Sequence, residues 1–419
     1  MLQHDASSDA AALHQPGLRA RLRPALPAGH RRRLIELGAE DRAALGIWAA
    51  AHVALLVLAW ASAWAFRSTR AHASLTGAFQ QWDAYLLRNI AQYGYFGPHS
   101  IPHNAAFFPG YPVVLSVAHL IVRNWTLAEL LVPAMAGCFA VVSLTRLAGG
   151  RRATLYLVAA PAAIFLMVGY SEVLFLALAV PAWHAAIRGR WWRAALLAGL
   201  AGLVRPDGLF LIPALAVMAL TGSYRPHQPP APGDDLDTES LPADGESRVP
   251  LRLRLANAVV ACTALAGPAA YEVYLRVQTG SWMAWSQALQ AGWDLHLTTP
   301  AQALRTTWWA AFRHPFSATI AFEFQLELGV MVVMLVAALA FAAVKRWPEA
   351  VYCGLALVAL GTSTWYQTAP RTLLVLFPVW VALARLGERW PAIRYAYLAV
   401  SAPIAVVLGT LYLSGMWAG

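Results

Sequence analysis

Residues 194–222 read AALLAGLAGLVRPDGLFLIPALAVMALTG, an apolar run that is interrupted by one charged pair, Arg205 and Asp207. The run is longer than the roughly 20 apolar residues with which a helix crosses a bilayer. Pro206 and Gly208 stand beside the charges and break a helix at that point. The stretch therefore predicts two apolar helices that meet in a turn near membrane depth, where charged side chains are costly and by default mark a function.

The apolar character extends over the whole chain. Hydrophobic residues make up 59% and charged residues 12% of the 419 residues. A soluble globular domain carries about 25% charged residues. The composition therefore predicts an all-α polytopic membrane protein with about ten or eleven transmembrane helices of bilayer length.

The remaining composition excludes several classes of protein. The net charge is +10, but the arginines stand in short clusters between apolar runs, which is typical of membrane topology and not of a nucleic-acid-binding face. Cys138, Cys262 and Cys353 lie scattered in apolar runs and predict neither a disulfide framework nor a metal site. No metal-ligand spacing, Walker loop or GxGxxG occurs, so we expect no protein-built metal site, no cofactor and no soluble nucleotide-binding domain.

The positions of the arginine clusters order the transmembrane spans. Residues 107–122 could either cross the membrane or lie at its surface. Only the second topology places the clusters at 146–152 and 188–193 in the cytosol, as the positive-inside bias requires, and we adopt it. We then expect spans at 44–65, 127–144, 153–169, 170–187, 194–204, 208–222, 255–277, 327–344, 349–364, 372–386 and 393–414.

Polar segments divide the chain into modules. Residues 1–42 predict a basic cytosolic tail and residues 223–250, rich in Pro, Asp and Ser, a cytosolic linker, both disordered. Between them lies an N-terminal membrane module, 43–222, with a first outer loop at 67–104. A C-terminal membrane module, 251–419, carries an outer loop at 278–326. We expect a multi-pass protein of the plasma membrane, here a bacterial inner membrane, with its N-terminus in the cytosol.

This topology gathers polar segments on the outer side. The two outer loops, the short segment Tyr170–Glu172, residues 364–371 and the turn at 205–208 all face that way. Such a concentration predicts a site that opens to the outer side of the membrane.

The first outer loop contains a candidate catalytic carboxylate. Residues 79–95 read FQQWDAYLLRNIAQYGY, an amphipathic aromatic stretch typical of a helix at the membrane interface. Asp83 in this stretch could act as a general base toward an acceptor hydroxyl. It could equally be the N-cap of the interfacial helix. The spacing alone leaves both interpretations open.

Three further positions carry charge near the predicted spans. Arg205 at the broken helix could bind a phosphate, or it could form an internal pair with Asp207 that closes the turn. Arg371, in the segment Gln367–Arg371, could be a second phosphate ligand, or its side chain could extend along the bilayer toward water. Glu172 could belong to a site or to a helix cap.

These segments together resemble the PIG-V family, the GPI mannosyltransferases and their bacterial relatives within the GT-C superfamily of polytopic glycosyltransferases. The resemblance runs from about residue 81 to residue 378 and follows the family's order of motifs. The matching motifs are WDA at 82–84, FFPGYP at 107–112, YSE at 170–172, RGRWW at 188–192, RPDG at 205–208, the segment 280–293, PR at 370–371 and FP at 377–378.

The resemblance implies a fold, a reaction and a set of site residues. The fold would be a GT-C-like helical bundle with interfacial helices in the first outer loop. The donor would be a polyprenyl-phosphate sugar, with mannose as the first choice, and the acceptor a glycolipid, a glycan or a protein. Asp83 would be the catalytic base, and Arg205, with Arg371 as a second candidate, would hold the donor phosphate as it leaves. The residues predicted to bind the donor or the substrate are Trp82, Arg88, Tyr111, Glu172, Arg205, Asp207, Gln287, Trp293 and Arg371.

A function of another class would use similar features. A secondary transporter or a flippase of a lipid-linked sugar also places charges at broken helices near the middle of the membrane. The longest polar loops lie on one face, and the two halves show no internal repeat, so the sequence favours an enzyme. A scaffold protein would not need Arg205 and Asp207 inside an apolar run.

Overall fold

The computed structural model describes residues 37–65, 77–224, 249–313 and 316–417. Residues Ala39–Gly419 form one compact unit. Its described residues contain helices and a single isolated β-bridge between Leu297 and Ser363, and no strand. The predicted all-α architecture is thereby confirmed. Most of the predicted tail and linker lie outside the described residues, but residues 39–42 of that tail already belong to the first helix.

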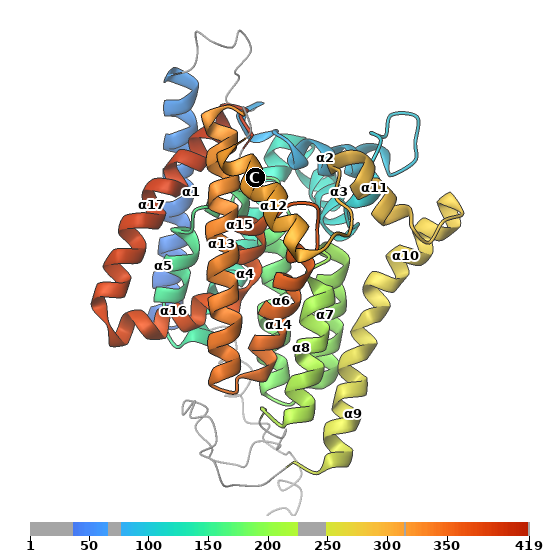
Figure 1. Cartoon of the computed structure of the whole chain (residues 1–419), viewed down its shortest axis with the longest axis vertical. Helices are drawn as coiled ribbons and strands as arrows, with labels where there is room; N and C mark the ends of the chain where they lie inside the picture. Colours follow the sequence, from blue (N-terminus) through green and yellow to red (C-terminus); the bar gives the residue numbers. More distant parts are fainter. Residues whose placement is uncertain (1–36, 66–76, 225–248, 314–315, 418–419) are drawn as a thin grey trace, which may run out of the picture. The chain divides into compact units, whose positions relative to one another are not determined.

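Helices of very different length build the unit (Figure 1). The α-helices are α1 (Ala39–Ala65), α2 (Asp83–Tyr93), α3 (Gly110–Val122), α4 (Trp125–Ala148), α5 (Arg152–Val158), α6 (Glu172–Ile187), α7 (Trp191–Val204), α8 (Gly208–Thr221), α9 (Leu251–Cys262), α10 (Ala266–Thr279), α11 (Ala284–Trp293), α12 (Pro300–Phe312), α13 (Ala318–Ala343), α14 (Trp347–Gly361), α15 (Ala369–Val375), α16 (Phe377–Arg389) and α17 (Pro391–Leu413). Short 3-10 turns are η1 (Gly77–Phe79), η2 (Asn104–Ala106), η3 (Ala163–Leu166) and η4 (Thr263–Leu265).

Several of these helices are long and apolar enough to cross a membrane. Within the described residues they are α1, α4, α13, α17 and the continuous segment Leu251–Thr279, which joins α9 to α10. Helices α15 and α16, bent by 74° at their junction, would together make one more span. The chain is therefore a multi-pass membrane protein. Helices α3, α6, α7, α8 and α14 have 10–17 residues, fewer than the roughly 20 of a full span, so the count of ten or eleven spans stays a prediction.

Two of the predicted spans are not single continuous helices. The span at 153–169 is interrupted, because α5 ends at Val158 and η3 follows Pro161. A proline lacks the N–H for a helix bond and disfavours helix in the residue before it. The span at 372–386 is broken at Leu376. Pro378 is the physical reason, since its ring would clash with the carbonyl group four residues earlier in a continuous helix.

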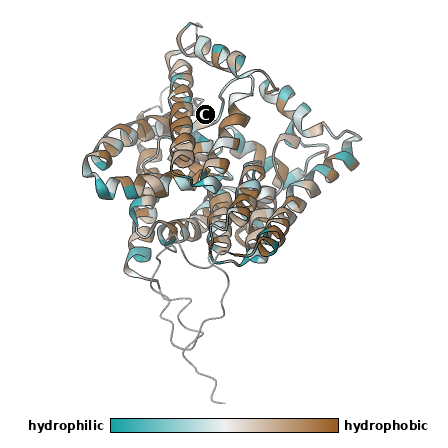
Figure 2. Cartoon of the chain, turned by 60° about the horizontal axis from the view of Figure 1, so that its bottom comes forward, coloured by the Kyte–Doolittle hydropathy of each residue, from teal (hydrophilic) through white to brown (hydrophobic). Residues whose placement is uncertain are grey.

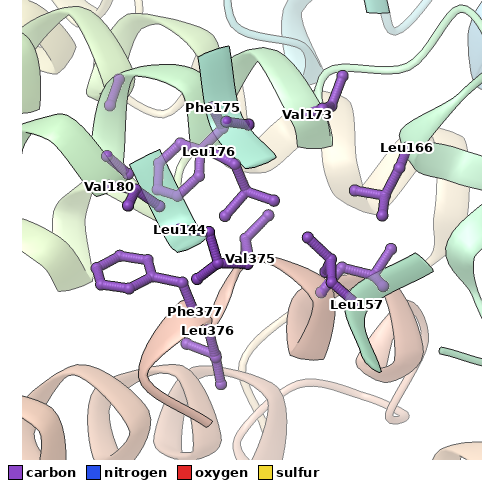
Figure 3. Packing of buried hydrophobic residues seen from close by; sticks show 14 of the residues in the cluster. Leu144, Leu157, Leu166, Val173, Phe175, Leu176, Val180, Val375, Leu376 and Phe377 are labelled. Carbon is purple, nitrogen blue, oxygen red and sulfur yellow. The ribbon is translucent and has the colours of Figure 1, made fainter. Parts of the chain in front are cut away.

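The buried core lies where the shorter apolar helices meet. Helix α6 packs against α4 and α7, and α8 packs against α9 and α14. Figure 3 shows Phe175 and Val180 of α6 together with Leu144 of α4 and with Val375 and Phe377 at the α15–α16 bend. All five side chains are buried. This packing fixes the start of α6 and the whole of α15 relative to each other, and both elements carry predicted site residues.

The outer surfaces of the long helices remain apolar. Trp60 and Trp64 of α1 and Leu339 of α13 are all more than half exposed. Figure 2 shows hydrophobic residues along the helices of the bundle. Large exposed apolar surfaces are rare on soluble monomers and are expected on helices that contact lipid.

Charged groups mark one end of the bundle. Arg146 at the end of α4 contacts Asp41, and Arg151 before α5 contacts Glu40, each at 2.7 Å.

Helices α2, α11 and α12 lie at the end opposite to α16 (Figure 1). There the backbone N–H of Thr298 donates to the carbonyl of Thr362 at 2.7 Å. The second predicted outer loop thus meets the segment before α15, as expected from the topology, and the side of the membrane that this end faces stays a prediction.

Candidate active site

Asp83 stands at the start of α2 and points its carboxylate toward α15. Its Oδ2 accepts a hydrogen bond from Nη1 of Arg371 at 2.7 Å. Its backbone N–H donates to the Tyr170 hydroxyl at 3.2 Å. The N-cap position is occupied by Trp82, which has a φ of 53° and makes no side-chain cap. The interpretation of Asp83 as a helix cap is therefore wrong.

Arg371 lies between two carboxylates. Beside its bond to Asp83, its Nε donates to Oε1 of Glu172 at 2.7 Å. The guanidinium carbon lies 4.7 Å from the centre of the Tyr170 ring and 5.1 Å from that of Phe165, which adds cation–π attraction. Only 7% of the residue is exposed, so the interpretation of Arg371 as a side chain extending to water is wrong.

Glu172, the first residue of α6, joins both arginines. Its Oε1 also contacts Nη1 of Arg205 at 2.8 Å, and the residue is fully buried. The N-cap of α6, Ser171, makes no side-chain cap bond, and its hydroxyl instead accepts from Arg205 at 3.3 Å. Ser171 and Glu172 therefore contact the buried arginines, and the interpretation of this segment as a cap of helix α6 is wrong.

The predicted break between α7 and α8 holds Arg205 in place. Nε of Arg205 donates to Oδ2 of Asp207 at 2.8 Å, so the internal pair exists alongside the contact with Glu172. The backbone N–H groups of Arg205, Gly208 and Leu209 donate to carbonyls of the chain around the break. These N–H groups are thus already used and do not contribute to anion binding.

Asp83, Arg371, Glu172, Arg205 and Asp207 together form what we call the charge network. Acidic and basic groups alternate along it, with carboxylate–guanidinium contacts of 2.7–2.8 Å. Three carboxylates and two guanidiniums give a formal charge of −1 when all are ionised. Exposure differs along it, since the side chain of Asp83 is 16% exposed while those of Glu172 and Asp207 are 0% and 5% exposed. Asp83 is therefore the carboxylate of the network that a substrate reaches most easily.

Other predicted residues surround this network. Arg88 of α2 lies 3.7 Å from the buried carboxylate of Glu129 in α4. Tyr111 of α3 is fully buried, and its hydroxyl has no hydrogen-bond partner within the described parts of the chain. Trp82 is 45% exposed and donates from its indole to the carbonyl of Met416 at 3.1 Å.

Gln287 and Trp293 lie elsewhere. Both belong to α11, which packs in a separate cluster with Phe108 and Tyr271. The Trp293 ring stands 5.5 Å from that of Phe107. The structure therefore divides the predicted site residues into the charge network and a second group on α11.

Sequence reasoning missed several buried polar residues. Glu129 in α4 and Glu323 and Glu327 in α13 are at most 1% exposed, and none was singled out. The available signal was an isolated carboxylate within an apolar run, which by default indicates a function.

Within the residues that the structure describes, no group of three or more His, Cys, Asp or Glu is arranged to hold a metal ion.

Comparison with known proteins relates the first half of the chain to one family. Residues 51–227 match the family described as Mannosyltransferase (PIG-V). GPI alpha-1,6-mannosyltransferase 2 of Mus musculus is 35% identical over 156 residues, which are 32% of this chain and 30% of that protein. The Homo sapiens protein of the same name is 34% identical over 153 residues, with the same coverage. The match thus spans less than a third of these relatives, and it confirms the resemblance to the PIG-V family for this part of the chain.

Solved structures show a more distant similarity. The archaeal oligosaccharyltransferase AglB from Archaeoglobus fulgidus, in complex with an inhibitory peptide and a dolichol-phosphate, aligns with a TM-score of 0.36 and 15% identity. The alignment covers 80% of this chain and 52% of that chain. The apo form of the Archaeoglobus fulgidus oligosaccharyltransferase aligns with a TM-score of 0.35 at the same identity and coverage.

Proposed function

We propose that this relative of the PIG-V mannosyltransferases is an integral membrane glycosyltransferase. It transfers a sugar, with mannose as the first choice, from a polyprenyl-phosphate donor to an acceptor hydroxyl on the outer face of the membrane. The observation that carries the proposal is the placement of Asp83 at the edge of a buried charge network, with its partly exposed carboxylate bonded to Arg371 and its backbone N–H bonded to the Tyr170 hydroxyl. Asp83, Glu172 and Arg205 also fall within residues 51–227, which match the family.

Asp83 would act as the general base. Arg371 binds Oδ2 of the carboxylate, and Oδ1 has no partner within the described residues, so Oδ1 can accept the proton of an acceptor hydroxyl. The acceptor oxygen then forms a bond to the anomeric carbon while the bond from that carbon to the phosphate oxygen breaks. The proton passes to Asp83, and the polyprenyl phosphate leaves with the electron pair.

The two arginines would have different roles. The leaving phosphate gains charge in the transition state, which a nearby guanidinium stabilises. Arg371 is bonded to Asp83, the most exposed carboxylate of the network. Arg205 contacts Glu172, Asp207 and Ser171 instead. We therefore assign phosphate contact first to Arg371 and give Arg205 a positioning role through Glu172, which reverses the order expected from the resemblance, where Arg205 came first and Arg371 second.

The test is transfer of labelled mannose from polyprenyl-phosphate-mannose in membranes that contain the chain. Asp83→Asn should lower the rate by about 10²–10⁴-fold, the usual contribution of a general base. Asp41→Asn is a matched control, because Asp41 is also a shielded carboxylate paired with an arginine, at the arginine-rich end of the bundle. Full transfer by Asp83→Asn would refute its role as base. If the wild-type chain is inactive with mannose, other polyprenyl-linked sugars are tested in the same way.

A transporter or flippase of a lipid-linked sugar is the alternative. The charged break between α7 and α8 favours it, since such breaks bind substrates in transporters. Purified chain in sealed vesicles would distinguish the two. Movement of polyprenyl-phosphate-mannose across the bilayer without transfer to any acceptor would favour transport.

A further inference from the structure

A second candidate site lies outside the charge network, between the first loop and α11. It is an open cavity of about 500 Å³, lined by residues 95, 96 and 100–105 and by residues of α11 and the end of α10. Cavities that bind small molecules measure about 300–1,000 Å³. We call this cavity the α11 pocket.

One wall of the α11 pocket is a helix face with small side chains. Ala284, Ala288 and Ala291 line it, at positions that share one face of a helix. Gln287 lines the same wall and is exposed. The alanines leave space for a ligand, and the amide of Gln287 can both donate and accept hydrogen bonds.

The opposite wall is a loop held rigid by one buried amide. Oδ1 of Asn89 accepts from the backbone N–H of Ile101 at 3.0 Å and from Nδ2 of Asn104 at 2.9 Å. Nδ2 of Asn89 donates to the carbonyl of His99 at 3.0 Å. Asn104 lines the pocket and is 1% exposed, yet its Oδ1 has no partner in the described chain. The wall therefore holds an unsatisfied acceptor just beneath the pocket surface, and a ligand hydroxyl that displaces the covering atoms could bond to it.

Aromatic side chains complete the pocket, and the charge of its lining is close to zero. Tyr95 and Phe96 line it, and no Asp, Glu, Lys or Arg does. Burial raises the pKa of Tyr95 well above its usual value, so the ring stays uncharged, and its hydroxyl donates to the carbonyl of Phe107 at 2.9 Å. Trp285 ties α11 to η2 by donating to the carbonyl of Ala106 at 3.1 Å. The pocket thus has no arginine or lysine to pair with a phosphate, and His103 is the one imidazole in its lining.

From these features we infer that the α11 pocket binds a neutral sugar residue of the acceptor. A hexose ring has an apolar C–H face that packs on aromatic rings and a rim of hydroxyls that bond to amides, which matches Tyr95, Gln287 and Asn104. This inference rests on the proposed glycosyltransferase function, and it assigns a glycan-bearing acceptor to this end of the molecule. A peptide acceptor fits less well, because the lining contains no Asp, Glu, Lys or Arg and no strand edge to pair with its backbone.

The inference is tested by direct binding of sugars to the purified full chain in nanodiscs. Saturation-transfer NMR would be recorded with methyl α-mannopyranoside, methyl α-glucopyranoside, N-acetylglucosamine and an uncharged serine peptide as probes. Gln287→Ala removes an exposed hydrogen-bonding group, and Ala291→Trp fills the space at another exposed position. Gln290→Ala is the matched control, since Gln290 is exposed on the same helix but does not line the pocket.

We expect at least one of the sugars to give a signal with the wild-type chain and with Gln290→Ala. Gln287→Ala should weaken that binding roughly fivefold, as expected for one lost hydrogen bond, and Ala291→Trp should abolish it. Signals unchanged by Ala291→Trp, no sugar signal at all, or a signal from the peptide alone would each overturn the inference. Asp83→Asn should bind the sugars as the wild type does but should lose transfer. Sugar binding and sugar transfer are measured separately, so a failure of the proposed catalysis can be distinguished from a failure of the proposed sugar site.

Discussion

At the scale of single residues, the sequence identified most of the charged groups but, apart from the pair of Arg205 with Asp207, not their partners. Asp83, Glu172 and Arg371 each stood out as a charge beside an apolar run. Their contacts join residues separated by 199 and 288 positions, and such distances leave no periodic signal in a sequence. The sequence therefore suggested two arginines free to bind phosphate, whereas each arginine already contacts two carboxylates.

The residue on which the network depends most is Glu172. Glu172→Gln would leave Arg371 and Arg205 without the charge that they share, and breaking a buried ion pair in this way costs about 3–5 kcal/mol. We expect a clear drop in the thermal unfolding midpoint of the purified chain together with loss of transfer. Glu349→Gln is the control, because Glu349 is also buried beside an arginine, Arg346, in a different part of the fold. An unfolding midpoint equal to that of the wild type would show that Glu172 has no such role.

At the scale of elements, local helix-breaking signals predicted one break and were overlooked at two others. Pro206 and Gly208 flank a charge, so the end of α7 was predicted correctly. Pro161 and Pro378 stand in runs without charge, where apolar composition outweighed the proline and suggested continuous spans. The bend at Leu376 matters for function because it sets the direction of α15, the helix that carries Arg371.

Gly208 provides a test of the α7–α8 break. A Cβ at this position would lie 2.4 Å from the Cα of Gly202, a backbone atom that cannot rotate away. Gly208→Ala should therefore push the two helices apart, at a cost of about 1–3 kcal/mol, as is typical of overpacking, and should displace Arg205. Reduced transfer and a lower unfolding midpoint are expected. Gly354→Ala in α14 is the control, because nothing lies within 4 Å of the new Cβ. Its unfolding midpoint should match or exceed that of the wild type. Equal unfolding midpoints for Gly208→Ala and Gly354→Ala would refute the packing argument.

At the scale of the whole molecule, the sequence predicted which polar segments lie at the same end of the bundle. This followed from the order of the apolar spans and from the positions of the arginine clusters between them. The second predicted outer loop meets the segment before α15, and arginines near α4 and α5 meet the start of α1. The α11 pocket was not predictable, since it depends on the spacing of three alanines and on the bonds of Asn89. These features look ordinary in a sequence, and only the fold brings them together.

The orientation of the bundle decides whether the proposed transfer occurs outside the cell. The positive-inside bias places the arginine-rich end in the cytosol, which puts Asp83 and the α11 pocket outside. In a chain whose three cysteines are replaced by alanine, Gln302→Cys on α12, an exposed position, should react with an impermeant maleimide in intact cells. Asp235→Cys, in the predicted cytosolic linker and outside the described residues, should react only after permeabilisation. The reverse pattern would place the charge network on the cytosolic side, where the donor and the acceptor would both have to be cytosolic.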